Sequence, residues 1–150
     1  ATLSQNKIQD FVEYIDDYDV GGQQAIAHGE TDIAFSPNAI VGNQITFKPF
    51  KGAHIALLSK YVGRQFLDNT SNEGRQIDAY FTNDIRLGYQ WSKGMLKNAS
   101  ITLLINNIAN TLYESNGYTY GWIYGGVRDT YNYYYPQAGT NFLLGVKVRF

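Results

Sequence analysis

Apolar and polar residues alternate along the last twelve positions of the chain. From Phe142 onward the even-numbered positions are all apolar: Phe142, Leu144, Val146, Val148 and Phe150. The odd-numbered positions include Gly145 and two charged residues, Lys147 and Arg149. Successive side chains of a strand point to opposite faces, so this pattern predicts a strand with one apolar and one polar face. A soluble sheet with its apolar face against a core shows the same alternation.

The same period of two predicts further strands upstream. They are expected over residues 39–48, 53–67, 79–91 and 99–108, with a weaker one over 1–15. The clearest is 79–91, where Phe81, Ile85 and Leu87 fall on one face and the charged pair Asp84 and Arg86 on the other. The chain is therefore predicted to be all-β and antiparallel, with about six strands.

Short and long connections between these strands alternate. The short ones are predicted at 49–52, which contains a Pro and a Gly, and at 92–98. The long ones are predicted at 16–31, 68–77 and 109–137. Short turns at one end and long loops at the other are the asymmetry of an outer-membrane β-barrel. The terminal aromatic Phe150 fits such a barrel, although Val148 stands where an aromatic is usual.

Composition narrows the class of protein. The formal net charge is −1, which gives no reason to expect nucleic acid as a partner. Cysteine is absent, which excludes disulfides and thiolate metal sites. The chain has no run of about 18 apolar residues, so a transmembrane helix is not expected. A β-barrel is still compatible with the sequence, because its strands alternate lipid-facing and lumen-facing residues. The N-terminus has no basic and apolar leader, so we expect a mature chain or a piece of a longer one.

The sequence offers no catalytic, metal or cofactor site. It lacks a Gly-x-Ser-x-Gly motif and a phosphate-binding glycine loop followed by Lys, and His28 and His54 lie far apart. The acidic run Asp17-x-Asp19-x-Gly21 suggests calcium but lacks the glycine spacing and closing glutamate of an EF-hand. A solvated loop is the better interpretation of that run. An enzyme is not expected.

Five segments carry a more specific signal. In order, they read IQDF (8–11, followed by Tyr14), TFKPFKG (46–52), KYVGRQFLDNT (60–70), INNIANTLYESNGY (105–118) and YPQAGTNF (135–142). Together they resemble the C-terminal end of TonB-dependent outer-membrane receptors of the SusC type. Thr140 departs from the family, which has an aromatic or an arginine there.

This resemblance implies a fold and a function. Members of the family are barrels of roughly 22 strands with a plug inside. They import oligosaccharides or peptides held against a SusD-type surface lipoprotein, and TonB supplies the energy. Residues 1–150 are then the C-terminal part of such a barrel in the outer membrane of a Gram-negative bacterium. The plug, the earlier strands and the N-terminal part that meets TonB are absent from this chain. The expected partners are the rest of the barrel with its plug, the SusD-type lipoprotein, TonB and outer-membrane lipid.

The assignment to a barrel wall also predicts where the candidate functional residues lie. The residues expected to line the lumen are Lys60, Arg64, Asp84, Arg86, Lys147 and Arg149. The residues expected outside, in contact with substrate or lipoprotein, are Tyr118, Tyr120, Trp122 and Tyr124. Gly145, Val148 and Phe150 form the expected assembly signal. The lumen charges have an equally good structural interpretation, pairing across strands.

A second class of protein also fits the residues. The 13 tyrosines suit a surface that binds sugars as well as a membrane interface. A secreted, aromatic-rich β-sandwich that binds carbohydrate would turn its apolar faces into a core. Strand length, loop asymmetry and Phe150 favour the barrel over this alternative.

The barrel interpretation predicts how the chain behaves when it is made alone. Six strands cannot close a barrel of that size, and an open sheet leaves its edges and an apolar face exposed. Residues 1–150 expressed alone should therefore be insoluble. A soluble monomer that unfolds cooperatively would contradict this interpretation.

Overall fold

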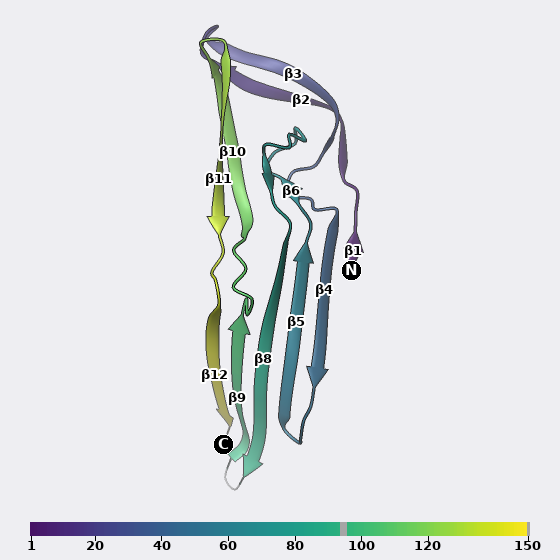
Figure 1. Cartoon of the computed structure of the whole chain (residues 1–150), viewed down its shortest axis with the longest axis vertical. Helices are drawn as coiled ribbons and strands as arrows, with labels where there is room; N and C mark the ends of the chain where they lie inside the picture. The colour runs from purple at the N-terminus through teal and green to yellow at the C-terminus, as the bar shows by residue number, and fades with distance from the viewer. Residues whose placement is uncertain (94–95, 150) are drawn as a thin grey trace.

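The computed structural model describes residues 1–93 and 96–149, and its regular elements there are all β-strands. The largest sheet has six strands in the order β1-β4-β5-β8-β9-β12 (Figure 1). Their bounds are β1 Thr2–Leu3, β4 Ala39–Phe47, β5 Ala53–Val62, β8 Tyr80–Lys93, β9 Leu96–Asn106 and β12 Asn141–Arg149. All neighbours in this sheet are antiparallel.

Two hairpins extend from the upper end of this sheet in Figure 1. One consists of β2 (Lys7–Asp17) and β3 (Gly22–Asp32), and the other of β10 (Glu114–Tyr124) and β11 (Val127–Pro136). They join as a four-stranded sheet in the order β11-β10-β2-β3. Two short strands, β6 (Gln65–Phe66) and β7 (Gln76–Ile77), pair within the loop that leads from β5 to β8.

The all-β, antiparallel class predicted from the sequence is confirmed, with one short parallel pairing between β2 and β10. The predicted strands 39–48, 53–67, 79–91 and 99–108 correspond to β4, β5, β8 and β9, although β5 ends at Val62. The predicted loops 16–31 and 109–137 are wrong, because each contains much of a hairpin. The predicted turn 92–98 is also too long, since β8 and β9 continue through most of it. The predicted strand 1–15 is split, and only Thr2–Leu3 belongs to the main sheet.

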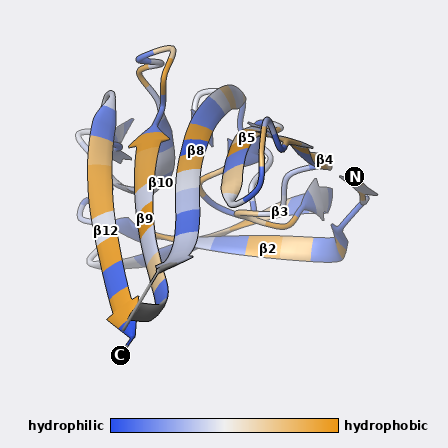
Figure 2. Ribbon diagram, turned by 90° about the horizontal axis from the view of Figure 1, so that it is seen from below, coloured by the Kyte–Doolittle hydropathy of each residue, from blue (hydrophilic) through white to orange (hydrophobic). Residues whose placement is uncertain are grey.

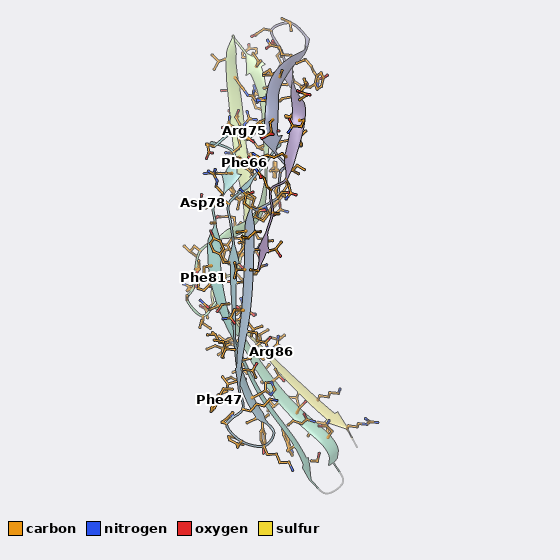
Figure 3. All side chains as sticks on the ribbon, turned by 90° about the vertical axis from the view of Figure 1, so that its right-hand side faces the viewer. Phe47, Phe66, Arg75, Asp78, Phe81 and Arg86 are labelled. Atoms are coloured by element: carbon orange, nitrogen blue, oxygen red, sulfur yellow. The ribbon has the colours of Figure 1, made fainter. Side chains whose placement is uncertain are left out.

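The main sheet is a single layer. Viewed along its length it forms a curved wall whose strands alternate between apolar and polar residues (Figure 2). Edge on, Phe47 and Phe81 project from one side and Arg86 from the other (Figure 3). Large apolar side chains stay exposed: Phe142, Leu144 and Val146 are 78%, 58% and 65% accessible. Within the described residues, burial on this face comes only from neighbouring side chains.

Strand register aligns the apolar residues into rows across the sheet. One row is Ile45, Leu57, Ile85, Ile105 and Phe142, and the next is Phe47, Ile55, Leu87, Leu103 and Leu144. The third row is Ala53, Tyr89, Ile101 and Val146. We call the face that carries these rows the apolar face. Lys60, Asp84 and Lys147 have the opposite parity and define the polar face.

Buried side chains cluster where the hairpins meet the sheet. Phe66, Leu67 and Ile77 of the β6–β7 segment are buried there, together with Ile15 of β2 and Val62 of β5. The backbone of this segment also supports the chain between β3 and β4, because the N–H of Phe35 donates to the carbonyl of Phe66 at 3.0 Å. The small apolar core therefore anchors the hairpins.

Asn107 joins the segment that follows β9 to the segment that precedes β12. Its Nδ2 donates to the carbonyls of Thr111 and Ala138 at 2.9 and 3.2 Å, and its Oδ1 accepts from the N–H of Thr111. Thr140 donates its hydroxyl to the carbonyl of Asn107 at 2.7 Å. Asn107 is 3% exposed and has a φ of 49°, a conformation that asparagine tolerates better than most residues. These bonds give a structural role to segments 105–118 and 135–142, two of the five segments on which the family resemblance rests.

The turn between β4 and β5 requires glycine at position 52. Gly52 has a φ of +87°, and a Cβ there would lie 2.2 Å from the carbonyl oxygen of Gln90. We expect Gly52→Ala to lower the free energy of unfolding by at least about 1 kcal/mol, from the left-handed backbone alone. Gly42→Ala is the control, because a Cβ at Gly42 meets no atom within 4 Å. Equal midpoints of the two variants in urea unfolding, measured in detergent, would contradict the role given to Gly52.

Candidate functional site

Five of the six residues predicted to line the lumen share the polar face. Lys60 lies opposite Thr82 in the register of β5 and β8, and Asp84 and Arg86 follow Thr82 at the same parity. Lys147 and Arg149 of β12 lie opposite Ser100 and Asn98 of β9, on that same face. The face is mixed, because Leu58, Leu104 and Leu143 also belong to it. The structure thus brings together polar side chains from four strands.

Arg64 does not belong to this face. It follows the end of β5 and forms an ion pair with Glu73, while its Nη1 donates to Gln76 Oε1 at 3.2 Å. Its guanidinium carbon also lies 5.4 Å from the centre of the Phe66 ring. Because β5 ends at Val62, the strand's period of two does not extend to Arg64, and a role for Arg64 in the lumen wall stays a prediction.

Two residues of the predicted assembly signal, Gly145 and Val148, lie on the edge strand β12. Gly145 is paired with Thr102 and Val148 with Ala99 on β9, and these two positions face opposite sides of the sheet. Phe150 lies outside the described residues.

The four aromatic residues predicted to lie outside form part of a larger ladder. Tyr118, Tyr120, Trp122 and Tyr124 share one face of β10, and Tyr131, Tyr133 and Tyr135 of β11 face the same way. The rings of Tyr120 and Tyr133 are nearly parallel, with centres 5.8 Å apart, and those of Trp122 and Tyr131 are 5.3 Å apart. We call this row the tyrosine ladder: Tyr118, Tyr120, Trp122, Tyr131, Tyr133 and Tyr135.

The ladder gives the hairpin one exposed aromatic side. Its five tyrosines are each more than two-fifths accessible. Tyr134 has the opposite parity, and its hydroxyl donates to the carbonyl of Gln76 at 3.1 Å. The face that bears Tyr134 therefore packs on the β6–β7 segment, and the ladder faces away from it.

The tips of the two hairpins are joined through Asp19. Its carboxylate oxygens accept from the N–H groups of Gly125 and Gly126 at 2.8 and 2.7 Å. The N–H of Tyr18 donates to the carbonyl of Ile123 at 3.0 Å. The acidic run that suggested a calcium loop thus includes a carboxylate that caps the other hairpin. In the described parts of the chain, no three His, Cys, Asp or Glu side chains are grouped so that they could hold a metal ion.

A partly buried charge cluster also joins the two hairpins. Glu13 of β2 accepts from Arg75 Nη1 at 3.1 Å and from Arg128 Nη1 at 3.0 Å, and a second nitrogen of Arg128 completes a forked pair. His28 Nε2 of β3 lies 2.9 Å from the same carboxylate. Arg75 also donates to Asp68 at 2.7 Å. One carboxylate thus links β2, β3, β11 and the β6–β7 loop, and we call this group the Glu13 cluster.

The cluster changes the acidity of Glu13. Burial alone would raise the pKa of this carboxyl, but hydrogen bonds from Arg128, His28 and Arg75 outweigh it and lower the pKa from 4.5 to about 2. Burial would likewise lower the pKa of Arg75, and its bonds to Asp68 and Glu13 raise it instead. Both groups are therefore held in their charged forms.

The two histidines have separate structural surroundings. His28 belongs to the Glu13 cluster, whereas the ring of His54 lies across Gly88, where an added Cβ would be 2.0 Å from its Cε1. An open hollow of about 720 Å³ beside His54 is lined by Thr46, Lys48, Lys51 and Gln90, among others.

Comparison of the chain with protein-family models, curated proteins and solved structures gives no match. Among the described residues, no helix has the length and apolar character needed to cross a membrane.

The Glu13 cluster makes the hairpins sensitive to acid. A carboxyl whose pKa is lowered on folding stabilises the folded state at pH values above its ordinary pKa. This stabilisation is lost as the pH falls from 4.5 through about 2. The shift corresponds to about 3 kcal/mol. We expect Glu13→Gln to remove it, so that amide hydrogen exchange in β10 and β11 becomes faster at pH 6 and changes less between pH 5 and 2 than in the wild type.

Glu30→Gln on the neighbouring strand is the matched control, because Glu30 accepts only an exposed bond from Gln9. If Glu13→Gln and Glu30→Gln gave the same exchange profile, the cluster would not hold the hairpins.

Proposed function

We propose that this chain forms part of the barrel wall of an outer-membrane, TonB-dependent transporter of the SusC type. In this role the apolar face meets lipid and the polar face meets the plug and the passing solute. The transporter imports oligosaccharides or peptides together with a SusD-type surface lipoprotein. The wall itself carries out no chemistry.

The observation that carries this proposal is the uncovered apolar face. Two aligned rows of large apolar side chains run across five strands, and a third row, from Ala53 to Val146, runs across four. A fourth row contains Trp91, Ala99 and Val148. A water-soluble protein rarely leaves so large an apolar surface exposed. Hydrocarbon is a medium in which this surface is favourable, provided the backbone groups are paired between strands.

Aromatic rings mark both ends of the apolar face. Tyr61 and Phe81 are paired at the upper end, and Tyr89 stacks on Trp91 with ring centres 5.4 Å apart at the lower end. From Phe81 to Trp91 the strand rises about 34 Å, which a tilt of about 40° reduces to about 26 Å. This agrees with the apolar band of about 25 Å between the aromatic girdles of such barrels. One polar row interrupts the band near its upper end, where Ser59 donates to Asn83 at 2.7 Å.

The edges of the sheet support a larger assembly. β12 is one end of the strand order, and β1 pairs with β4 only at Ala39 and Ile40. Among the described residues, the outer edge of β12 and that of β4 beyond Ile40 have no strand partner. Open edges of this length favour pairing with further strands. In the proposed transporter, these strands are the rest of the barrel.

The hairpins and the tyrosine ladder belong to the outer end of this wall. They lie opposite the tight turn between β4 and β5, as expected for extracellular loops of such a barrel (Figure 1). Tyrosine combines an apolar ring with a hydroxyl, which suits contact with a sugar or with a protein lid. We assign this contact to the tyrosine ladder, which includes the predicted Tyr118, Tyr120 and Trp122.

The alternative, a secreted sandwich that binds carbohydrate, requires a second layer over the apolar face. Within the described residues no such layer exists, and the four-stranded sheet continues from the upper end of the wall. The tyrosine ladder is the observation that would suit this alternative. The exposure of Phe142, Leu144 and Val146 does not suit it.

Introducing charge on each face tests the proposal. Leu103→Arg places a cation in the middle of the apolar face, and a lipid-facing site penalises this by about 2–4 kcal/mol. We expect Leu103→Arg to reduce the assembled transporter in the outer membrane strongly. Thr102→Arg, one residue earlier and on the polar face, is expected to assemble. Assembly is measured as detergent-extracted protein that migrates differently on gels before and after boiling.

Equal assembly of the two variants, or protein that stays dissolved without detergent, would contradict the proposal. Solubility in buffer together with binding of a glycan to the tyrosine ladder would favour the sandwich.

A further inference from the structure

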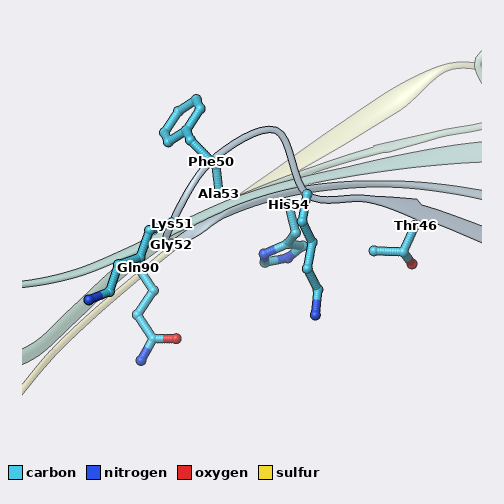
Figure 4. A pocket seen from close by; sticks show the side chains of 8 residues that line it. Thr46, Phe50, Lys51, Gly52, Ala53, His54 and Gln90 are labelled. Carbon is cyan, nitrogen blue, oxygen red and sulfur yellow. The ribbon is translucent and has the colours of Figure 1, made fainter.

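The charges of the chain are divided between its two ends. Twelve of the 13 Asp and Glu residues but only four of the 12 Lys and Arg residues lie in segments 1–38, 63–79 and 107–140, which therefore carry a formal charge of −8. These segments hold the hairpins and the loops beside them. The other eight basic residues lie in the main sheet and its β4–β5 turn, where Lys51 and His54 line the open hollow (Figure 4).

The negative charge of the hairpin segments is not compensated within them. All four of their basic residues already form ion pairs with carboxylates of the same segments, two of them in the Glu13 cluster. Four of the twelve carboxylates are used in these pairs, so eight have no cationic partner among the described residues. A surface with such a surplus raises the local concentration of cations and speeds the arrival of a cationic solute.

Two of the eight unpaired carboxylates flank Trp122. Its partner on β11 is Asp129, and its partner on β2 is Asp16. Directly paired residues share a face of the sheet, and neighbouring strands lie about 4.8 Å apart. Both carboxylates are exposed. Within the described residues, the side chain of Asp129 has no hydrogen-bond partner, and that of Asp16 accepts only from Gln23 at 2.8 Å. We call Trp122, Asp16 and Asp129 the Trp122 group.

Trp122 ends the stacked part of the tyrosine ladder. Its ring centre lies 5.8 Å from that of Tyr120 and 5.3 Å from that of Tyr131, with the ring planes 26° and 23° apart. Tyr120 and Tyr131 are paired with each other one row nearer the base of the hairpin. Among the described residues, no ring stacks on Trp122 from the side of the hairpin tip. The Trp122 group thus offers an aromatic face between two carboxylates.

This combination suits a cationic group. The quadrupole of an aromatic ring attracts a cation over its face, most strongly for tryptophan, and each carboxylate can form an ion pair with the same cation. A neutral sugar stacked on Trp122 would leave both carboxylates uncompensated. Of the two solute classes of the proposed transporter, peptides supply cations through lysine, arginine and the amino terminus, whereas common oligosaccharides are neutral or anionic.

We propose that the Trp122 group binds a cationic side chain of a basic peptide, and that basic peptides are the solute class of this transporter. This inference rests on the proposed function, which places the tyrosine ladder at the outer end of the wall, and it narrows the solute to one class. The acidic hairpins gather the peptide at the entrance, and the Trp122 group holds it there. Binding weakens as salt screens the charges.

Isothermal titration calorimetry of the assembled transporter in detergent tests this inference. The probe is the peptide acetyl-Gly-Arg-Gly-Arg-Gly-amide, whose two arginines point the same way in an extended chain. We expect it to bind more tightly than the neutral peptide acetyl-Gly-Gln-Gly-Gln-Gly-amide and the neutral oligosaccharide maltohexaose. In Asp16→Asn/Asp129→Asn the arginine peptide should bind about tenfold more weakly, because two exposed charge pairs are lost. Trp122→Leu should weaken it as well, because the aromatic face is lost.

Asp10→Asn/Glu30→Gln is the matched control, because it removes two exposed carboxylates from the β2–β3 hairpin and changes the net charge equally. Asp10 is six residues from Asp16 along β2, about 20 Å at 3.4 Å per residue. This is beyond the screening length of about 8 Å in 0.15 M salt. The control variant should therefore bind the arginine peptide as the wild type does.

Equal weakening in the two double variants would overturn the inference, and so would an unchanged affinity in Trp122→Leu. Tighter binding of the glutamine peptide or of maltohexaose than of the arginine peptide would assign the site to a neutral solute and overturn it too. So would a lack of arginine-peptide binding by a barrel that gel migration shows to be intact. Failure of the proposed function itself is distinguishable, because the protein would then dissolve without detergent, and the same titration in buffer would still test the Trp122 group.

Discussion

The register of the main sheet is the constraint on which the rest of the structure depends. Because side chains alternate with a period of two, a slip of one residue between β9 and β12 would move Phe142, Leu144 and Val146 to the polar face. Hydrogen bonds between strands fix this register, and the bonds of Asn107 and Thr140 set the point at which β12 begins. One layer can then present two different surfaces. The apolar rows gain stability only when a medium other than water covers them.

The two hairpins are held together by a different interaction. They contribute few buried apolar side chains, and their junction depends on the carboxylates of Glu13 and Asp19. Glu13 is contacted by side chains from β3, β11 and the β6–β7 loop, while Asp19 caps the tip of the other hairpin. Removing one partner of such an ion pair is costly, because it leaves the other charge without compensation. The upper part is therefore precisely arranged but depends on pH, and the wall depends on its surroundings.

The sequence predicts the wall better than the hairpins, and the reason is physical. Alternation is local, so the faces of β4, β5, β8, β9 and β12 follow from a few neighbouring residues. β3 reads GQQAIAHGETD and has no clear alternation, so its pattern predicts a loop. The tyrosine ladder depends on the pairing of β10 with β11, for which the pair Gly125-Gly126 was an unused turn signal. The Glu13–Arg128 pair joins residues 115 positions apart, and no local pattern reveals it. The basic residues of the polar face, such as Arg86 and Lys147, were hidden by a balanced net charge, because they gather only once the strands are in register.

The medium in contact with the apolar face is the central claim, and site-directed spin labelling measures it most directly. Residues 1–150 contain no cysteine, so a single cysteine placed at position 103 or 102 gives this part of the protein one label. In the assembled protein in lipid vesicles, the account predicts that the label at 103 is relaxed by oxygen dissolved in the bilayer and is shielded from a water-soluble nickel complex. At 102 it predicts the reverse, or shielding from both reagents by the plug. A label at 103 that the nickel complex reaches freely, or that both reagents fail to reach, would contradict a lipid-facing wall.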